Sequence, residues 1–228
     1  MSLAGAEQTQ PDLFAPPPEA TMAFVLRLRA RGIADIDVLR ALETVPRHLF
    51  VPHLYVDLAW RDVALPIACG QTMPEPWLVA RMMEALKPAP DHRVLEIGAG
   101  SGYATAILAR LAREVVSFER FGSLATEAAT RLRQLDVANA RVLHGDGLAP
   151  GGEHGVFERV LIHGVVERVP EAVLSLVVEN GVVVFVARDV NGKCVLKRLA
   201  HENAAGWRET EAGACRATDM IPGLSTIF

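Results

Sequence analysis

The segment VLEIGAGSGY, residues 94–103, constrains the fold of this chain more than any other feature. It begins as an apolar β-strand, continues as a loop with the glycine spacing G-x-G-x-G, and leads into a helix-length segment. Glycine has no Cβ, so the backbone can approach a ligand closely, and the first turn of a helix offers free N–H groups. A strand, a glycine loop and a helix in this order are typical of parallel α/β sheets that bind an adenosine-containing cofactor. An ordinary strand-to-helix junction is the alternative for this segment taken alone.

The spacing of the loop separates the cofactor classes. A dinucleotide fingerprint has its third glycine one position later, where this chain has Tyr103. Glu96 lies on the strand, two residues before the first glycine. An acidic residue there, followed by G-x-G-x-G, resembles motif I of the class I S-adenosylmethionine-dependent methyltransferases. We therefore expect S-adenosylmethionine and not NAD, bound by Glu96 and by a loop that consists of Gly98, Ala99, Gly100, Ser101 and Gly102.

Two later strand ends also carry acidic residues. Glu119 ends an apolar strand 19 residues after Gly100, where a carboxylate can accept hydrogen bonds from both ribose hydroxyls. Asp146 ends the next strand between Gly145 and Gly147, where it can accept a hydrogen bond from the adenine amine and the glycines can admit the ring. A solvent-facing strand end and an ordinary Asp-Gly turn are the alternatives for each acid alone. Three such strand ends in succession favour one cofactor site.

The pattern after residue 91 alternates between strands and helices. Apolar runs predict strands near 93–97, 114–119, 140–144, 157–163 and 181–187, with helices near 102–112, 122–136 and 170–178. Repeated β-α units with nearly continuous apolar strands imply a parallel sheet covered on both faces. Two further strands near 194–200 and 207–217 are expected to form an antiparallel hairpin at the edge of the sheet.

The first ninety residues have a different pattern. Residues 1–18 are polar and rich in proline, which predicts a disordered tail. Helices are expected over 19–31, ended by Gly32, and over 36–44 and 77–86. We therefore divide the chain into a tail (1–18), a helical annex with an irregular loop (19–90) and an α/β domain (91–228).

Composition excludes several function classes. The chain has 228 residues, half of them hydrophobic, which suffices for a full core. A net charge of −4 argues against a general nucleic-acid or membrane-surface binder. Three cysteines without metal-ligand spacing suggest a reducing, cytoplasmic setting and no disulfide framework. The longest apolar stretches, 172–178 and 182–187, are too short to span a bilayer.

Five segments taken in order resemble the protein-L-isoaspartate (D-aspartate) O-methyltransferase family, which methylates isoaspartyl side products in damaged proteins. They are VPRHLFVP (45–52), LPIACGQTMPEP (65–76), the 94–112 segment, HGDG (144–147) and FERVLIHGVVERVPEAVL (157–174). The resemblance implies a seven-stranded class I methyltransferase sheet, S-adenosylmethionine as cofactor, no metal, and isoaspartyl proteins or peptides as partners. It also implies that the 65–76 loop covers the cofactor and forms the acceptor site. The residues that it adds to the cofactor site are Gln71, Thr72 and Arg120.

The chain departs from the family at three positions. Pro74 stands where the family loop has a serine, and a proline has neither a hydroxyl nor an N–H. His163 replaces a common threonine at the end of the fourth strand, and Glu158 replaces an aspartate. The catalytic candidates on the acceptor side are therefore Thr72, Pro74 and His163.

The chemistry of the reaction decides how much these departures matter. A carboxylate is already ionised at neutral pH and needs no general base to attack a sulfonium methyl group. Loss of one hydroxyl would then change affinity more than the reaction itself, whereas a phenol or amine acceptor would need a base such as His163. Three hypotheses stay open: an isoaspartyl methyltransferase, a methyltransferase for a small molecule, and a cofactor-binding homologue without activity.

Overall fold

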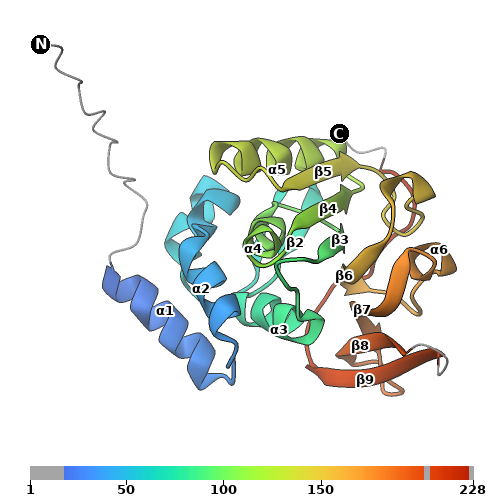
Figure 1. Cartoon of the computed structure of the whole chain (residues 1–228). Coiled ribbons are helices and arrows are strands. Elements are labelled where there is room, and N and C mark those ends of the chain that lie inside the picture. Colours follow the sequence, from blue (N-terminus) through green and yellow to red (C-terminus); the bar gives the residue numbers. More distant parts are fainter. Residues whose placement is uncertain (1–17, 203–205, 226–228) are drawn as a thin grey trace, which may run out of the picture.

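A seven-stranded sheet forms the centre of the molecule in the computed structural model, which describes residues 18–202 and 206–225 (Figure 1). The strands lie side by side in the order β5-β4-β3-β6-β7-β8-β9. The first five in this order pair in parallel, and the last two add antiparallel strands at one edge. Their bounds are β3 (Arg93–Ile97), β4 (Glu114–Glu119), β5 (Ala140–His144), β6 (Phe157–Val165), β7 (Val177–Arg188), β8 (Cys194–Glu202) and β9 (Gly206–Ala214).

Helices cover the sheet, and the N-terminal helices lie at the left of the molecule in Figure 1. Asp35 caps one of them by accepting hydrogen bonds from the N–H groups of Asp37 and Val38, which satisfies two of the free donors at the helix start. The α-helices are α1 (Pro18–Ala30), α2 (Ile36–Thr44), α3 (Pro76–Leu86), α4 (Tyr103–Leu111), α5 (Gly122–Gln134) and α6 (Glu171–Leu174). Short 3-10 helices are η1 (Arg47–Phe50), η2 (His53–Leu58), η3 (Ala68–Gly70) and η4 (Gly152–His154). A small hairpin pairs β1 (Leu65–Pro66) with β2 (Thr72–Met73).

Two hydrophobic clusters fill the two faces of the sheet. Successive strand residues alternate between them, so that Val94 joins one cluster and Leu95 joins the other. The first cluster also holds buried side chains from all of the helices α1 to α4. The annex expected over residues 19–90 therefore shares one continuous core with the sheet.

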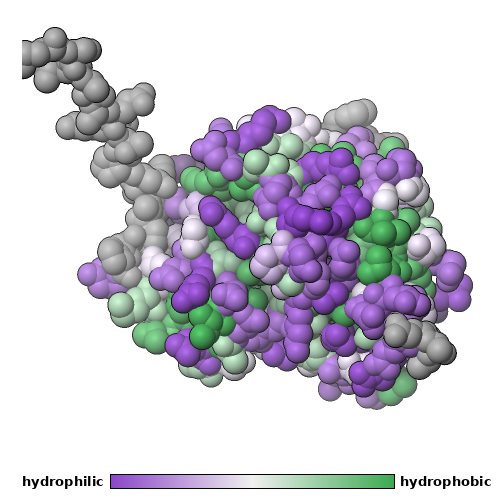
Figure 2. All heavy atoms as spheres, viewed as in Figure 1, coloured by the Kyte–Doolittle hydropathy of each residue, from purple (hydrophilic) through white to green (hydrophobic). Residues whose placement is uncertain are grey.

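The apolar half of the composition lies mostly inside the molecule. Figure 2 shows a largely hydrophilic surface on the face viewed in Figure 1, with hydrophobic residues in scattered patches. No helix among the described residues is long and apolar enough to cross a membrane.

The strand and helix predictions are confirmed apart from one element. The helix expected near 170–178 spans only Glu171–Leu174, and β7 begins already at Val177. Val177 pairs with Phe157 of β6 instead of continuing a helix. A short apolar run does not by itself distinguish a buried strand from a buried helix. The predicted disordered tail lies, except for its last residue, outside the described part of the chain.

Candidate functional site

Two cavities open at the carboxyl ends of the parallel strands. Strands β3 and β6 are neighbours although their sequence order reverses there, and ligands of open α/β sheets bind at such a switch point. The glycine cavity, about 820 Å³, lies between the glycine loop and the ends of β4 and β5. The tryptophan cavity, about 860 Å³, lies beside Trp77. The two cavities share four lining residues, which are Thr72, His163, Ala217 and Thr218.

The glycine loop divides into residues that line the cavity and one that packs helices. Gly98 and Gly100 line the cavity with φ of 93° and 54°, in the left-handed region that favours glycine. Gly102 lies at the start of α4, and a Cβ there would approach the Cβ of Ala128 on α5 to 3.1 Å. Ala99 and Ser101 are buried and are not among the lining residues.

Glu119 holds the glycine loop while its carboxylate faces the cavity. Its Oε2 accepts a hydrogen bond from the Gly100 N–H at 2.8 Å, and its Oε1 accepts one from the Phe121 N–H at 3.0 Å. The side chain is only 5% exposed, yet it lines the glycine cavity. A carboxylate oxygen has a second lone pair, so each can accept one more hydrogen bond from a ligand hydroxyl.

Asp146 lies across the same cavity. Its Oδ1 accepts a hydrogen bond from the Leu148 N–H at 3.0 Å, and its Oδ2 accepts one from the Gly223 N–H at 2.6 Å. The neighbouring glycines line the cavity, but packing against strand side chains already requires them. A Cβ at Gly145 would approach Phe118 to 2.9 Å, and a Cβ at Gly147 would approach Ile97 to 2.7 Å.

The C-terminal segment 217–225 contributes lining residues to both cavities, and this role was not predicted from the sequence. It pairs with the end of β6, where the Val165 N–H donates to the Thr218 carbonyl at 2.8 Å and the Val165 carbonyl accepts from the Met220 N–H at 2.9 Å. Gly164 allows this crossing, because a Cβ there would lie 2.6 Å from the Met220 side chain. Arg120 then donates from Nε to the Gly223 carbonyl at 2.9 Å. No motif marks this segment, since its contacts are with residues far away in the sequence.

Glu96 lies behind the glycine loop and not in the cavity. Its side chain is 0% exposed and is absent from both linings. The carboxylate accepts hydrogen bonds on Oε2 from the hydroxyls of Thr105 at 2.5 Å and Ser117 at 2.6 Å. Its Oε1 lies 2.8 Å from Nε2 of His163, whose ring lines both cavities. The acid expected to contact the cofactor therefore contacts a residue at the junction of the cavities.

The 65–76 loop lies against the glycine loop, where the Ser101 hydroxyl contacts Sδ of Met73 at 3.4 Å and Ile67 is the neighbour of Gly100. Its turn over η3 holds Cys69 and Gly70 at φ of 56° and 65°. Gln71 lines the glycine cavity, while Pro74 lines only the tryptophan cavity. Thr72 lies between them at the shared wall.

A buried arginine fixes the position of this loop. Arg47 is 0% exposed and donates from Nη2 to the carbonyls of Pro74 at 3.1 Å and Val63 at 3.0 Å. Its Nη1 donates to the carbonyl of Ala59 at 2.8 Å. Burial lowers the pKa of Arg47 from its ordinary value, which nearby Tyr103 and two carboxylates partly offset. The VPR segment therefore holds the 65–76 loop through its buried arginine.

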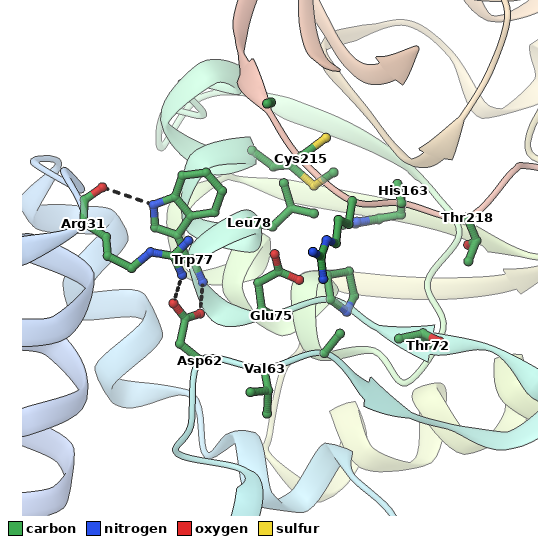
Figure 3. A pocket seen from close by; sticks show the side chains of 16 residues that line it. Arg31, Asp62, Val63, Thr72, Glu75, Trp77, Leu78, His163, Cys215 and Thr218 are labelled. Carbon is green, nitrogen blue, oxygen red and sulfur yellow. Dashed lines mark hydrogen bonds and ion pairs between the residues drawn. The ribbon is translucent and has the colours of Figure 1, made fainter. Parts of the chain in front are cut away.

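The tryptophan cavity has charged walls (Figure 3). Arg31 forms an ion pair with Asp62 and stacks 4.3 Å from the Trp77 ring centre. Burial raises the pKa of the Cys215 thiol to about 11, so this lining group stays neutral at physiological pH. Arg216 also lines the cavity and has no hydrogen bond or ion pair with any described residue.

Comparison with known proteins agrees with this geometry. The model of the family described as protein-L-isoaspartate(D-aspartate) O-methyltransferase matches residues 19–218. The chain is 45% identical over 211 residues to protein-L-isoaspartate O-methyltransferase 2 of Rhodopseudomonas palustris strain HaA2, which covers 92% of this chain and 96% of that one. It is 44% identical over 210 residues to the protein-L-isoaspartate O-methyltransferase of Nitrobacter winogradskyi, covering 92% and 96%.

Solved structures share the fold. A protein-L-isoaspartate O-methyltransferase structure superposes with a TM-score of 0.80 at 22% identity, over 90% of this chain and 67% of that one. A structure from Plasmodium falciparum, described as a putative enzyme of this type in complex with S-adenosyl-L-homocysteine, has a TM-score of 0.73 at 20% identity, over 86% and 96%. The predicted class I methyltransferase fold is confirmed.

Proposed function

This chain belongs to the protein-L-isoaspartate (D-aspartate) O-methyltransferase family, and we propose that it methylates the side-chain carboxylate of isoaspartyl residues in proteins. It is an S-adenosylmethionine-dependent methyltransferase. The observation that carries the proposal is the meeting of two cavities at Thr72 and His163, one lined by the glycine loop and one by the 65–76 loop. A methyl donor and a peptide acceptor need such adjoining sites. We place the reaction in the cytoplasm, since Cys69, Cys194 and Cys215 are all free thiols.

The glycine cavity fits the cofactor. A Cβ at Gly100 would approach the Ile67 side chain to 3.3 Å, so glycine at this position keeps the cavity wider than a larger residue would. Glu119 would accept hydrogen bonds from the ribose hydroxyls and Asp146 from the adenine amine. The backbone of Gly98, Gln71 and Thr72 would line the path toward the acceptor. When bound, S-adenosylmethionine supplies the electrophilic methyl group.

The protein's own task is to position and dehydrate the acceptor. An isoaspartyl carboxylate is ionised at neutral pH, so no base has to remove a proton. The acceptor loop must hold one carboxylate oxygen about 3–3.5 Å from the methyl carbon, in line with the leaving sulfur. Arg47 fixes this loop through the Pro74 carbonyl, and Thr72 retains a hydroxyl at the shared wall.

Transfer of labelled methyl from S-adenosylmethionine tests the proposal directly. The acceptors are an isoaspartyl peptide and its aspartyl twin, and label should enter only the isoaspartyl peptide. Cofactor binding without label in either peptide would favour another acceptor or a non-catalytic homologue. Pro74 is the reason to consider these two alternatives, because it lacks the hydroxyl expected on the acceptor side.

Pro74→Ser should raise the isoaspartyl methylation of this protein. The substitution restores a hydroxyl and an N–H on the acceptor side, while every residue of the glycine cavity stays the same. One neutral hydrogen bond is worth about 0.5–1.5 kcal/mol, so kcat/KM should increase roughly two- to tenfold. Steady-state kinetics with an isoaspartyl peptide measure the change, and Pro74→Ala is the matched control, since it removes the ring without adding a hydroxyl. Equal rates for all three proteins would show that this position does not contact the acceptor.

Arg216→Gln should raise KM for isoaspartyl peptides and leave kcat nearly unchanged. Arg216 lines the tryptophan cavity as an exposed cation without a described partner, and the acceptor is an anion. We expect a roughly two- to tenfold increase in KM at low salt. Added salt should make the difference between variant and wild type smaller, because exposed charges are screened. Arg40→Gln on α2 is the control, because Arg40 is exposed and lines neither cavity. An unchanged KM at low salt would remove Arg216 from the acceptor site.

A further inference from the structure

We propose that His163, held by the buried carboxylate of Glu96, binds the acceptor carboxylate as an imidazolium and replaces the hydroxyl that Pro74 cannot supply. This inference rests on the proposed function and names the group that recognises its substrate. The acceptor oxygen must lie beside the methyl donor, where the two cavities meet. Among the four residues that line both cavities, His163 is the one that can carry a positive charge.

The strand register brings the two side chains together. Glu96 lies near the end of β3 and His163 near the end of the neighbouring strand β6, on either side of the switch point. The His163 side chain is 7% exposed and that of Glu96 is 0% exposed. The distance between Nε2 and Oε1 is 2.8 Å, typical of a charge-assisted hydrogen bond.

Charge balance favours the imidazolium. A buried carboxylate is costly unless its charge is compensated. Thr105 and Ser117 donate hydrogen bonds to Glu96 but carry no charge, and His163 is its single ion-pair partner among the described residues. An imidazolium donates from both ring nitrogens. With Nε2–H on Glu96, Nδ1–H stays available for a ligand.

The pair therefore provides a hydrogen-bond donor in a fixed position, the Nδ1–H of His163, where the two cavities meet. Glu96 is a positioning residue, since it orients the ring and balances its charge without touching either cavity. His163 is the residue that contacts substrate.

The experiment compares the binding of two peptides to the full-length protein. One is a peptide with a β-linked isoaspartyl carboxylate, and the other is the same peptide with an isoasparaginyl carboxamide. Wild type should bind the carboxylate peptide more tightly, and His163→Asn should lose most of this preference, with KM for the substrate raised roughly 10- to 100-fold. The affinity for S-adenosylhomocysteine, measured by calorimetry, should change less than about threefold in each variant, because neither residue forms the ribose or adenine contacts.

A double-mutant cycle separates positioning from general structure. Glu96→Gln alone should raise KM in the same direction, but it should add little in the His163→Asn background, because both act through one contact. His201→Asn is the control, since His201 stacks on Trp207 and lines neither cavity. Unchanged discrimination in His163→Asn, or fully additive effects in the cycle, would overturn the inference while leaving the proposed function intact. Absence of isoaspartyl methylation in wild type would overturn both, and normal S-adenosylhomocysteine binding would then locate the failure on the acceptor side.

Discussion

Replacing Glu119 with alanine is expected to weaken S-adenosylhomocysteine binding roughly 100-fold or more. The substitution removes two acceptor oxygens that would bind the ribose hydroxyls, and each charge-assisted hydrogen bond is worth about 1.5–3 kcal/mol. It also removes the acceptor of the hydrogen bond that the Gly100 N–H donates to Glu119 at 2.8 Å, so the glycine loop is held less firmly. Isothermal calorimetry measures the affinity of both proteins.

Two further variants make this measurement specific. Glu119→Gln keeps one acceptor oxygen and should lie between alanine and wild type. Glu43→Ala removes an exposed carboxylate from α2 and should bind like wild type. Equal affinity in wild type and Glu119→Ala would remove Glu119 from the cofactor site.

Arg47→Met should lower the free energy of unfolding by about 3–5 kcal/mol. The guanidinium is fully buried and donates to four backbone carbonyls in two stretches of the chain, at Ala59, Arg61 and Val63 and at Pro74. Methionine fills part of the space but leaves these carbonyls without donors, and buried polar groups without partners are costly. Urea denaturation followed by circular dichroism measures the loss.

The Arg47 prediction also has a functional part. Because the Pro74 carbonyl would be released, KM for the acceptor should rise more than the dissociation constant for S-adenosylhomocysteine. Arg47→Lys should recover only part of the stability, since one ammonium cannot reach carbonyls that a planar guanidinium bridges. Arg40→Met, at an exposed helix position, should change the stability by less than about 0.5 kcal/mol. A stable Arg47→Met protein with an unchanged KM would show that the loop holds its position without this contact.

Local patterns were enough for the parallel sheet and the cofactor loop. The strands are continuous apolar runs, and glycine spacing is a property of a few adjacent residues. The position of Glu119 could also be predicted, because a strand end nineteen residues after Gly100 returns to the same edge of the sheet. The prediction of a helix near 170–178 was wrong for its second half, because it relied on the local pattern alone. Val177 belongs to β7, where it pairs with Phe157 of the neighbouring strand.

Long-range contacts were beyond prediction. The VPR segment resembles its family by sequence, but only the fold shows that Arg47 reaches the carbonyl of Pro74, 27 residues away. The C-terminal segment carries no motif. It becomes part of both cavities only because it forms backbone hydrogen bonds with Val165 of β6 and packs against Gly164.

Sequence alone determined the class of this protein through its β-α alternation and its methyltransferase glycine loop. It also predicted a carboxylate for the ribose and an acceptor loop in which Pro74 replaces a serine, and both remain predictions. The tertiary structure decided which groups face a ligand. The sequence predicts Glu96 as a cofactor residue, yet Glu96 lies behind the glycine loop. Its Oε1 is 2.8 Å from Nε2 of His163, on the other side of the switch point. The physical reason is that periodicity specifies which strand a residue occupies, whereas burial, register between non-adjacent strands and charge balance specify what its side chain meets.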